Sequence, residues 1–133
     1  MSQVGTWQPD SNAIALDRSL LVRLAQCAAH LEEPSLGLEP DEVVRYAALM
    51  RRSREQWRAA AAGADAALLE ALIRVLTIAE EKLPNWEGGA HSPVIALAAE
   101  LRSRGAYPKP LTAWIRAHSQ NKFLPWGSIA DRL

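Results

Sequence analysis

Apolar residues recur at helical spacing in five stretches of this 133-residue chain, and prolines or glycines stand at the ends of most of them. The most regular stretch, 92–104, places its apolar residues at positions i, i+3, i+4 and i+7, on one helical face: Val94, Leu97, Ala98 and Leu101. Alanine and leucine also dominate the composition, and side chains without a branch at Cβ lose little rotamer freedom in a helix. The sequence therefore predicts an all-α fold.

The expected helix bounds follow from these apolar stripes and from the residues that begin and end helices. Five helices are predicted, at about residues 13–33, 40–62, 65–83, 92–104 and 110–118. Pro40, Pro93 and Pro110 stand in first turns, where the missing N–H of proline costs nothing. Residues 1–12 lack periodicity and predict an irregular N-terminal arm. We expect residues 13–133 to form one domain, a bundle of four to five helices with a packed C-terminal tail.

Several classes of protein are disfavoured by the same residues. The chain has one cysteine, Cys27, and no apolar leader near its beginning, so we expect a cytoplasmic protein. No uncharged apolar run approaches the roughly 18 residues that span a bilayer, so no membrane contact is expected. Cys27 and His30 lie three residues apart, but a zinc site needs three or four ligands and no second pair follows. We therefore predict neither a metal nor another cofactor.

The charge pattern is more informative than the net charge, which is zero because 15 basic residues balance 15 acidic ones. Residues 32–42 sum to −5, whereas residues 45–58 sum to +4 and residues 102–122 to +5. Arginines outnumber lysines 12 to 3, which favours bidentate recognition of carboxylates or phosphates. The neutral total thus hides two basic segments that are candidates for binding an anionic partner.

Tryptophan and arginine are the residue types that most often anchor protein interfaces, and the C-terminal part of the chain is rich in both. We therefore predict a small adaptor or regulatory protein that binds a protein partner through an Arg/Trp-rich C-terminal surface. This prediction is compatible with self-association of the chain. The residues predicted for this surface are Trp86, Arg102, Arg104, Tyr107, Lys109, Arg116, Lys122 and Trp126.

A helix-turn-helix DNA-binding regulator is the alternative prediction, with residues 92–122 as the reading unit. Two predicted helices joined by a turn with Gly105 resemble that motif, whose second helix enters the major groove. Pro108 and Pro110 in the turn, and the bulky Leu101 before it, depart from the usual pattern. Any pair of antiparallel helices gives a similar spacing, so the adaptor is preferred.

One cation interrupts the apolar seam predicted for residues 40–62. Arg54 falls at a seam position, one helical turn before Trp57. Its side chain can reach water at the end of the bundle, pair with Glu70 or Glu100, or line a pocket for an anionic ligand beside Trp57. Arg54 and Trp57 are therefore candidate contacts for an anion or another ligand.

An enzyme is the third and least supported prediction. Glu87 and His91 flank the Gly88-Gly89 turn and could form an acid–base dyad, but no nucleophile or third orienting group is identifiable. The adjacent carboxylates of Glu80 and Glu81 point in different directions on a helix, and we expect them to be solvated. No phosphate-binding, dinucleotide-binding or hydrolase motif occurs, and no catalytic residue is assigned.

Overall fold

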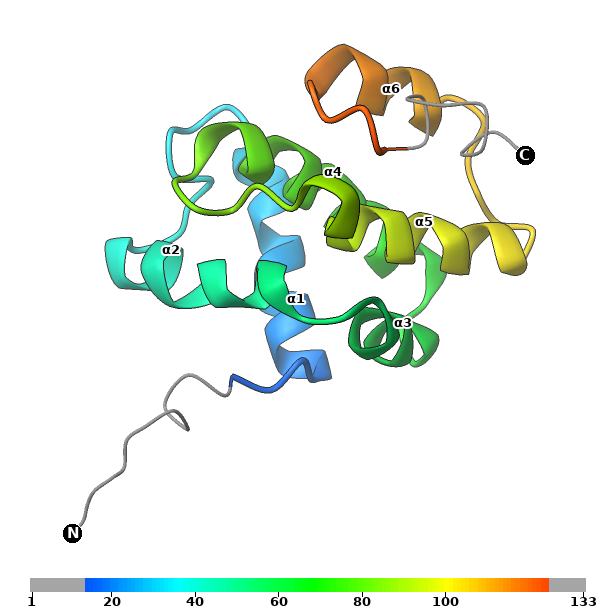
Figure 1. The fold of residues 1–133 in the computed structure, drawn as a ribbon, viewed down its shortest axis with the longest axis horizontal. Helices are drawn as coiled ribbons and strands as arrows, with labels where there is room; N and C mark the ends of the chain where they lie inside the picture. The colour runs from blue at the N-terminus through cyan, green and yellow to red at the C-terminus, as the bar shows by residue number, and fades with distance from the viewer. Residues whose placement is uncertain (1–13, 125–133) are drawn as a thin grey trace, which may run out of the picture.

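The computed structural model describes residues 14–124, and every regular element in this range is helical (Figure 1). The α-helices are α1 (Arg18–Gln26), α2 (Pro40–Tyr46), α3 (Arg54–Ala62), α4 (Ala66–Lys82), α5 (Pro93–Ser103) and α6 (Leu111–His118). Short 3₁₀ helices are η3 (Cys27–His30), η4 (Ala47–Arg51) and η5 (Gly89–His91). The all-α prediction is confirmed, with six α-helices in the described range instead of four to five. The predicted N-terminal arm lies outside the described residues.

The predictions for 65–83, 92–104 and 110–118 agree closely with α4, α5 and α6, because local signals fix their ends. The side chain of Asp65 caps α4 by accepting from the Leu68 N–H, at 2.8 Å. After α5, Gly105 has a φ of +68°, and its N–H donates to the Arg102 carbonyl while the next N–H donates to that of Leu101. This hydrogen-bond pair is a Schellman motif, in which glycine tolerates the left-handed backbone.

The predicted helix 13–33 is shorter in the structure. It begins at Arg18, because the Asp17 side chain caps it by accepting from the Leu20 N–H at 2.9 Å. From Cys27 it continues as the 3₁₀ turn η3. Cys27 is fully buried, and burial raises the pKa of its thiol.

The predicted continuous helix 40–62 is wrong, because the chain leaves helical geometry before α3. Ser53 is extended and forms a capping box with Gln56, in which each side chain accepts a hydrogen bond from the other residue's backbone N–H. The Ser-x-x-Gln pattern is the sequence signal for this start. The apolar spacing on both sides of the break mimics one uninterrupted seam.

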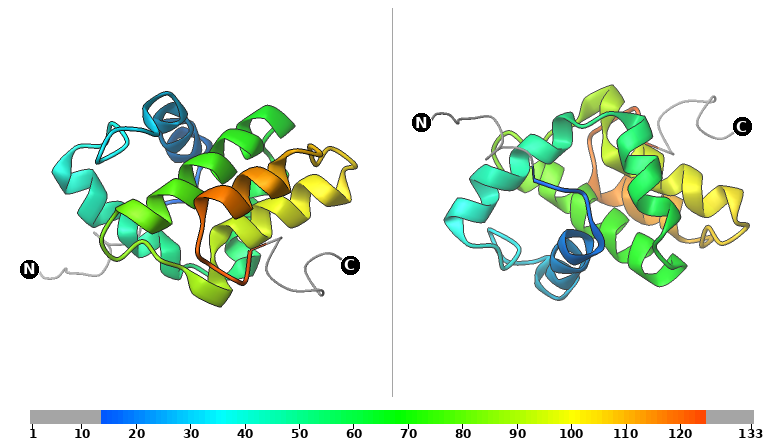
Figure 2. Two further views of the ribbon diagram at one scale, coloured as in Figure 1. Left: turned by 90° about the horizontal axis from the view of Figure 1, so that it is seen from above. Right: turned by 90° about the horizontal axis from the view of Figure 1, so that it is seen from below.

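Helices α4 and α5 form the centre of the fold. Helix α5 packs against both α3 and α4, and α4 also packs against α1 and α6, so that α6 lies over α4 (Figures 1 and 2). Helix α3 therefore joins the core chiefly through α5. Within the described residues, no helix is both apolar enough and long enough to cross a membrane.

A partly buried ion pair joins α1 to the start of α2. Arg23 donates through Nε and Nη2 to the two carboxylate oxygens of Glu42, at 3.0 and 2.7 Å, and Glu42 also accepts from the Glu39 N–H. Charge-assisted bidentate hydrogen bonds of this kind favour the ionised carboxylate. The bond from Arg23 is the main reason that the pKa of Glu42 falls to about 2.

Glu42→Gln should therefore cost stability in a pH-dependent manner. A pKa near 2 in the folded protein lies below the ordinary 4.5, so the stabilisation is present above about pH 4.5 and is lost as the pH falls towards 2. Because the Arg23 side chain is 31% exposed, solvent screening limits the loss to about 1–2 kcal/mol at pH 7. Urea unfolding at pH 7 and pH 2.5 measures this loss in the free energy of unfolding. Asp41→Asn, which removes an exposed pair with Arg45, is the control with almost no expected change.

Candidate functional site

The stretch 102–124 carries basic side chains and no acidic residue. It comprises the end of α5, the connection to α6, α6 itself and the segment after it. Besides the exposed Arg104, whose guanidinium binds backbone carbonyls, four cationic residues of the stretch are exposed in the structure: Arg102, Lys109, Arg116 and Lys122. We call these four residues, with Tyr107, Trp114 and Phe123, the basic aromatic surface. The structure thus leaves accessible most of the cations that the sequence predicted for a partner-binding surface.

Trp114 is half-buried on α6 and is held between partners. The His118 ring stacks on it with 4.3 Å between ring centroids, and the Arg74 guanidinium lies 4.8 Å from its centroid. His118 Nδ1 is also hydrogen-bonded to the Trp114 carbonyl at 2.7 Å, and Arg74 pairs with Glu70. These contacts fix the indole at the surface of α6, where it provides a preorganised aromatic face.

Tyr107 is fixed in a similar way in the connection between α5 and α6. The Arg102 guanidinium lies 4.5 Å from its ring centroid, within the range of a cation–π interaction. The Tyr107 hydroxyl forms a hydrogen bond of 2.9 Å with the Thr112 hydroxyl on α6. The ring therefore ties the connection to the first turn of α6.

Phe123 is the most unusual member of the basic aromatic surface, because 56% of this large apolar residue is exposed. Its backbone is nevertheless anchored: its N–H donates to Asn121 Oδ1, and the neighbouring Leu124 is fully buried. The amide of Asn121 in turn donates to the Gly89 carbonyl at 3.0 Å. The chain therefore presents an aromatic side chain to solvent on a turn that is held in place.

Two residues predicted for the partner-binding surface serve the fold instead. Trp86 is fully buried, and its indole N–H donates to the Val43 carbonyl at 2.8 Å. Arg104 donates to the carbonyls of Ala61 and Ala64 at 2.9 and 2.7 Å, and so satisfies the C-terminal end of α3. The assignment of Trp86 to an exposed surface is corrected, whereas Arg104 is exposed but uses its guanidinium to bind these backbone carbonyls. A third predicted residue, Trp126, lies outside the described range.

The first basic segment, 45–58, is largely used within the fold. Arg51 donates to the carbonyls of Asn85 and Glu87, Arg52 donates to the Ile14 carbonyl, and Arg58 pairs with Glu100. These guanidiniums satisfy backbone carbonyls of loops and pair with a carboxylate. Most of the arginines that give 45–58 its positive charge therefore form hydrogen bonds or ion pairs within the fold.

Arg54 is an exception in that segment, although its predicted place on a helical seam is wrong. It is the first residue of α3 and is exposed, where it borders a surface depression together with His91, Ser92 and Ile95. Its predicted carboxylate partners are taken by other arginines: Glu70 pairs with Arg74, and Glu100 with Arg58 and Arg104. An anion contact at Arg54 remains a prediction.

Trp57 cannot share that ligand contact. Its side chain is fully buried, and its indole N–H donates to the Leu49 carbonyl at 3.0 Å. The predicted pairing of Trp57 with Arg54 at a ligand site is therefore wrong. Arg54 and Trp57 both belong to α3, but Arg54 is its first residue and is exposed, whereas Trp57 packs in the core.

Glu80 is buried, contrary to the expectation that it is solvated, and is only 8% exposed. The Ser92 hydroxyl donates to Glu80 Oε2, and the Asn121 amide donates to Oε1 at 3.3 Å. Burial is the largest effect on this carboxyl and raises its pKa. A Cβ on Gly88 would lie 2.6 Å from the Ser92 Cα, so glycine is required for this close approach. The network joins α4, the loop before α5 and the segment that carries Phe123.

Glu87 and His91 form no acid–base dyad, since both are exposed and no hydrogen bond joins them in the described part of the chain. Among residues 14–124, no three His, Cys, Asp or Glu residues come close enough to hold a metal ion. Neither a protein-family model nor a curated protein or solved structure matches the chain. Function is therefore inferred from the basic aromatic surface itself.

Proposed function

We propose that this chain is a small cytoplasmic adaptor or regulatory protein that binds an acidic segment of a protein partner through the basic aromatic surface. The observation that carries the proposal is Phe123, an exposed aromatic side chain on an anchored turn within a stretch that has no acidic residue. An exposed aromatic side chain gains free energy when a partner covers it. The surrounding cations attract carboxylates and orient the encounter.

The components of the surface have separate roles in this proposal. Phe123 is the apolar anchor, and the fixed Trp114 indole adds a preorganised face that loses little entropy on binding. Arg116 and Lys122 supply charge on either side of the end of α6. An acidic segment with one or two large apolar side chains has the complementary chemistry.

The alternative, a helix-turn-helix DNA-binding regulator, has weaker support. The connection from Arg104 to Pro110 is seven residues long, whereas the motif uses a turn of about three or four. Helix α6 packs chiefly against α4, and the hydroxyl of Thr112 in its first turn is hydrogen-bonded to the Tyr107 hydroxyl instead of being free to contact a base. An exposed phenylalanine is also not required for contacts with phosphates. These observations favour the protein partner.

The partner is tested with the full chain as bait in affinity purification from its own host, followed by binding measurements with the recovered protein. Phe123→Ala and Arg116→Glu should each weaken binding at least about tenfold, without a change in melting temperature. The matched controls are Val44→Ala, an exposed apolar residue on α2, and Arg54→Glu, an exposed arginine on α3. A partner that binds all four variants equally would contradict the proposed surface.

Duplex DNA provides the test of the alternative. We expect no retardation of random or genomic duplex fragments at 50 to 200 mM salt, where phosphate-dependent binding changes steeply with about one unit of logarithmic slope per phosphate contact. Tight binding that falls with salt and is lost in Arg116→Glu would replace the protein partner with DNA.

A further inference from the structure

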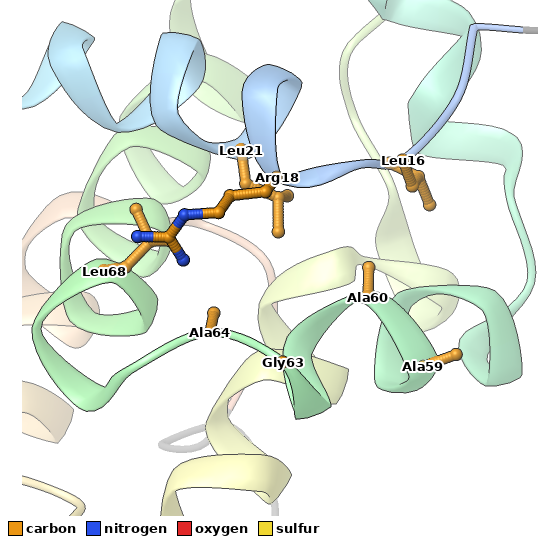
Figure 3. A pocket seen from close by; sticks show the side chains of 8 residues that line it. All are labelled: Leu16, Arg18, Leu21, Ala59, Ala60, Gly63, Ala64 and Leu68. Carbon is orange, nitrogen blue, oxygen red and sulfur yellow. The ribbon is translucent and has the colours of Figure 1, made fainter.

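A cavity of about 230 Å³ opens between the segment before α1, α1 itself, the end of α3 and the start of α4 (Figure 3). Its walls are aliphatic, with Leu16 and Leu21 on one side and Ala60, Ala64 and Leu68 on the other. Leu21 and Ala64 are buried, so the floor of the cavity belongs to the core. None of its lining residues belongs to the basic aromatic surface.

Arg18 is the charged residue in this lining. Its guanidinium extends across the cavity towards Leu68 (Figure 3). No carboxylate in the described part of the chain pairs with it, whereas Arg23 on the same helix pairs with Glu42. A cation beside an apolar cavity is complementary to a ligand that has one anionic group and one apolar part.

The absence of a side chain at Gly63 contributes to the open space. A Cβ placed there would meet no atom within 4 Å, and the φ of −91° is one that other residues adopt readily. For comparison, an apolar cavity of about 150 Å³ in a protein core binds benzene. The cavity here therefore has room for a ligand somewhat larger than a benzene ring, and too little for a typical cofactor.

We propose that this cavity binds a small amphipathic monocarboxylate, with an aliphatic tail of about six to eight carbons. The tail lies among Leu16, Leu21, Ala60 and Leu68, and the carboxylate accepts two hydrogen bonds from the Arg18 guanidinium. Burial of a short tail plus one exposed charge pair gives a dissociation constant on the order of 0.1–1 mM. This proposal does not rest on the proposed protein partner, because the cavity lining includes no residue of the basic aromatic surface.

The test titrates octanoate, octan-1-ol and acetate into the full-length protein and follows backbone amide NMR shifts. Octanoate should shift the amides of 59–68 and of the start of α1 with saturation in the submillimolar to millimolar range. Octan-1-ol should bind about tenfold more weakly because it lacks the charge, and acetate should not bind because it lacks the tail. Absence of saturable shifts with octanoate, or equal binding of octanoate and octan-1-ol, would overturn the proposal.

Two variants separate the roles of charge and volume. Arg18→Gln should weaken octanoate binding about tenfold and leave octan-1-ol binding unchanged. Gly63→Leu should fill the cavity and abolish binding of both, while Ala62→Leu, an exposed neighbour outside the cavity lining, should bind like the unmodified protein. Melting temperatures confirm that each variant is folded, and Gly63→Ser replaces Gly63→Leu if the larger side chain prevents folding. Undiminished octanoate binding in Arg18→Gln or in the folded Gly63 variant would refute the site.

Discussion

Trp86→Ala is expected to lower the free energy of unfolding by about 3–5 kcal/mol, the range for loss of a fully buried large aromatic side chain. The indole is fully buried, and it satisfies the Val43 carbonyl of α2. The substitution therefore leaves a cavity and a buried acceptor without its donor. A domain of this size has a total stability of about 5–15 kcal/mol, so the variant should be partly unfolded at moderate temperature. Urea unfolding followed by far-UV circular dichroism measures the loss.

Trp86→Phe is the matched control, because it keeps most of the apolar volume and removes only the indole N–H and part of the ring. Its expected loss is about 1–3 kcal/mol, and smaller than that of the alanine variant. The comparison also decides between the core role and the surface role that the sequence first indicated. A Trp86→Ala variant with unchanged stability and impaired partner binding would restore the surface role.

Local sequence signals were sufficient for half of the helices. Helices α4 and α5 were predicted because Asp65 and Ser92 are strong N-caps and each is followed by a broad apolar face. The break before α3 was missed, although Ser53 and Gln56 form a capping box in the sequence. Apolar periodicity alone does not distinguish one long helix from two shorter segments that keep the same phase.

The placement of single side chains depended on distant parts of the chain and was less predictable. Trp86 lies between Pro84 and the Gly88-Gly89 pair, a pattern typical of an exposed loop, but its indole N–H donates to a carbonyl 43 residues away. Arg104 similarly reaches carbonyls 40 and 43 residues away. Spacing along one helix carries no information on such contacts. The cations Lys109, Arg116 and Lys122 are exposed, as is usual for lysine and arginine side chains, and their exposure follows from residue type alone.

The buried carboxyl of Glu80 has the second large expected effect. Glu80→Leu should lower the free energy of unfolding by about 2–4 kcal/mol, because the hydroxyl of Ser92 and the amide of Asn121 lose their acceptor. The segment that carries Phe123 should loosen as well, since Asn121 anchors it. Chemical denaturation gives the energy, and amide hydrogen exchange of 119–124 reports the loosening.

Glu80→Gln tests whether the hydrogen bonds or the charge matter, because glutamine keeps an acceptor oxygen and removes ionisation. Burial raises the pKa of Glu80 in the folded protein, so the folded state holds the proton to higher pH than the unfolded state does. The contribution of Glu80 to stability is therefore greatest at acidic pH and falls as the pH rises from the unfolded pKa through the folded one. The stability of Glu80→Gln relative to the unmodified protein should increase over that same range.

The measurement compares the free energy of unfolding of Glu80→Gln with that of the unmodified protein, by urea unfolding between pH 4 and pH 8. The contributions of most other titrating groups cancel in the difference between the two values. If the difference in free energy of unfolding between Glu80→Gln and the unmodified protein stays constant across this range, burial does not stabilise the protonated form of the carboxyl. A difference that decreases with pH would mean that Asn121 and the Gly88 N–H favour the ionised form more than burial opposes it. In that case the Ser92 hydroxyl donates to a buried carboxylate, and Glu80→Gln should approach the loss expected for Glu80→Leu at neutral pH.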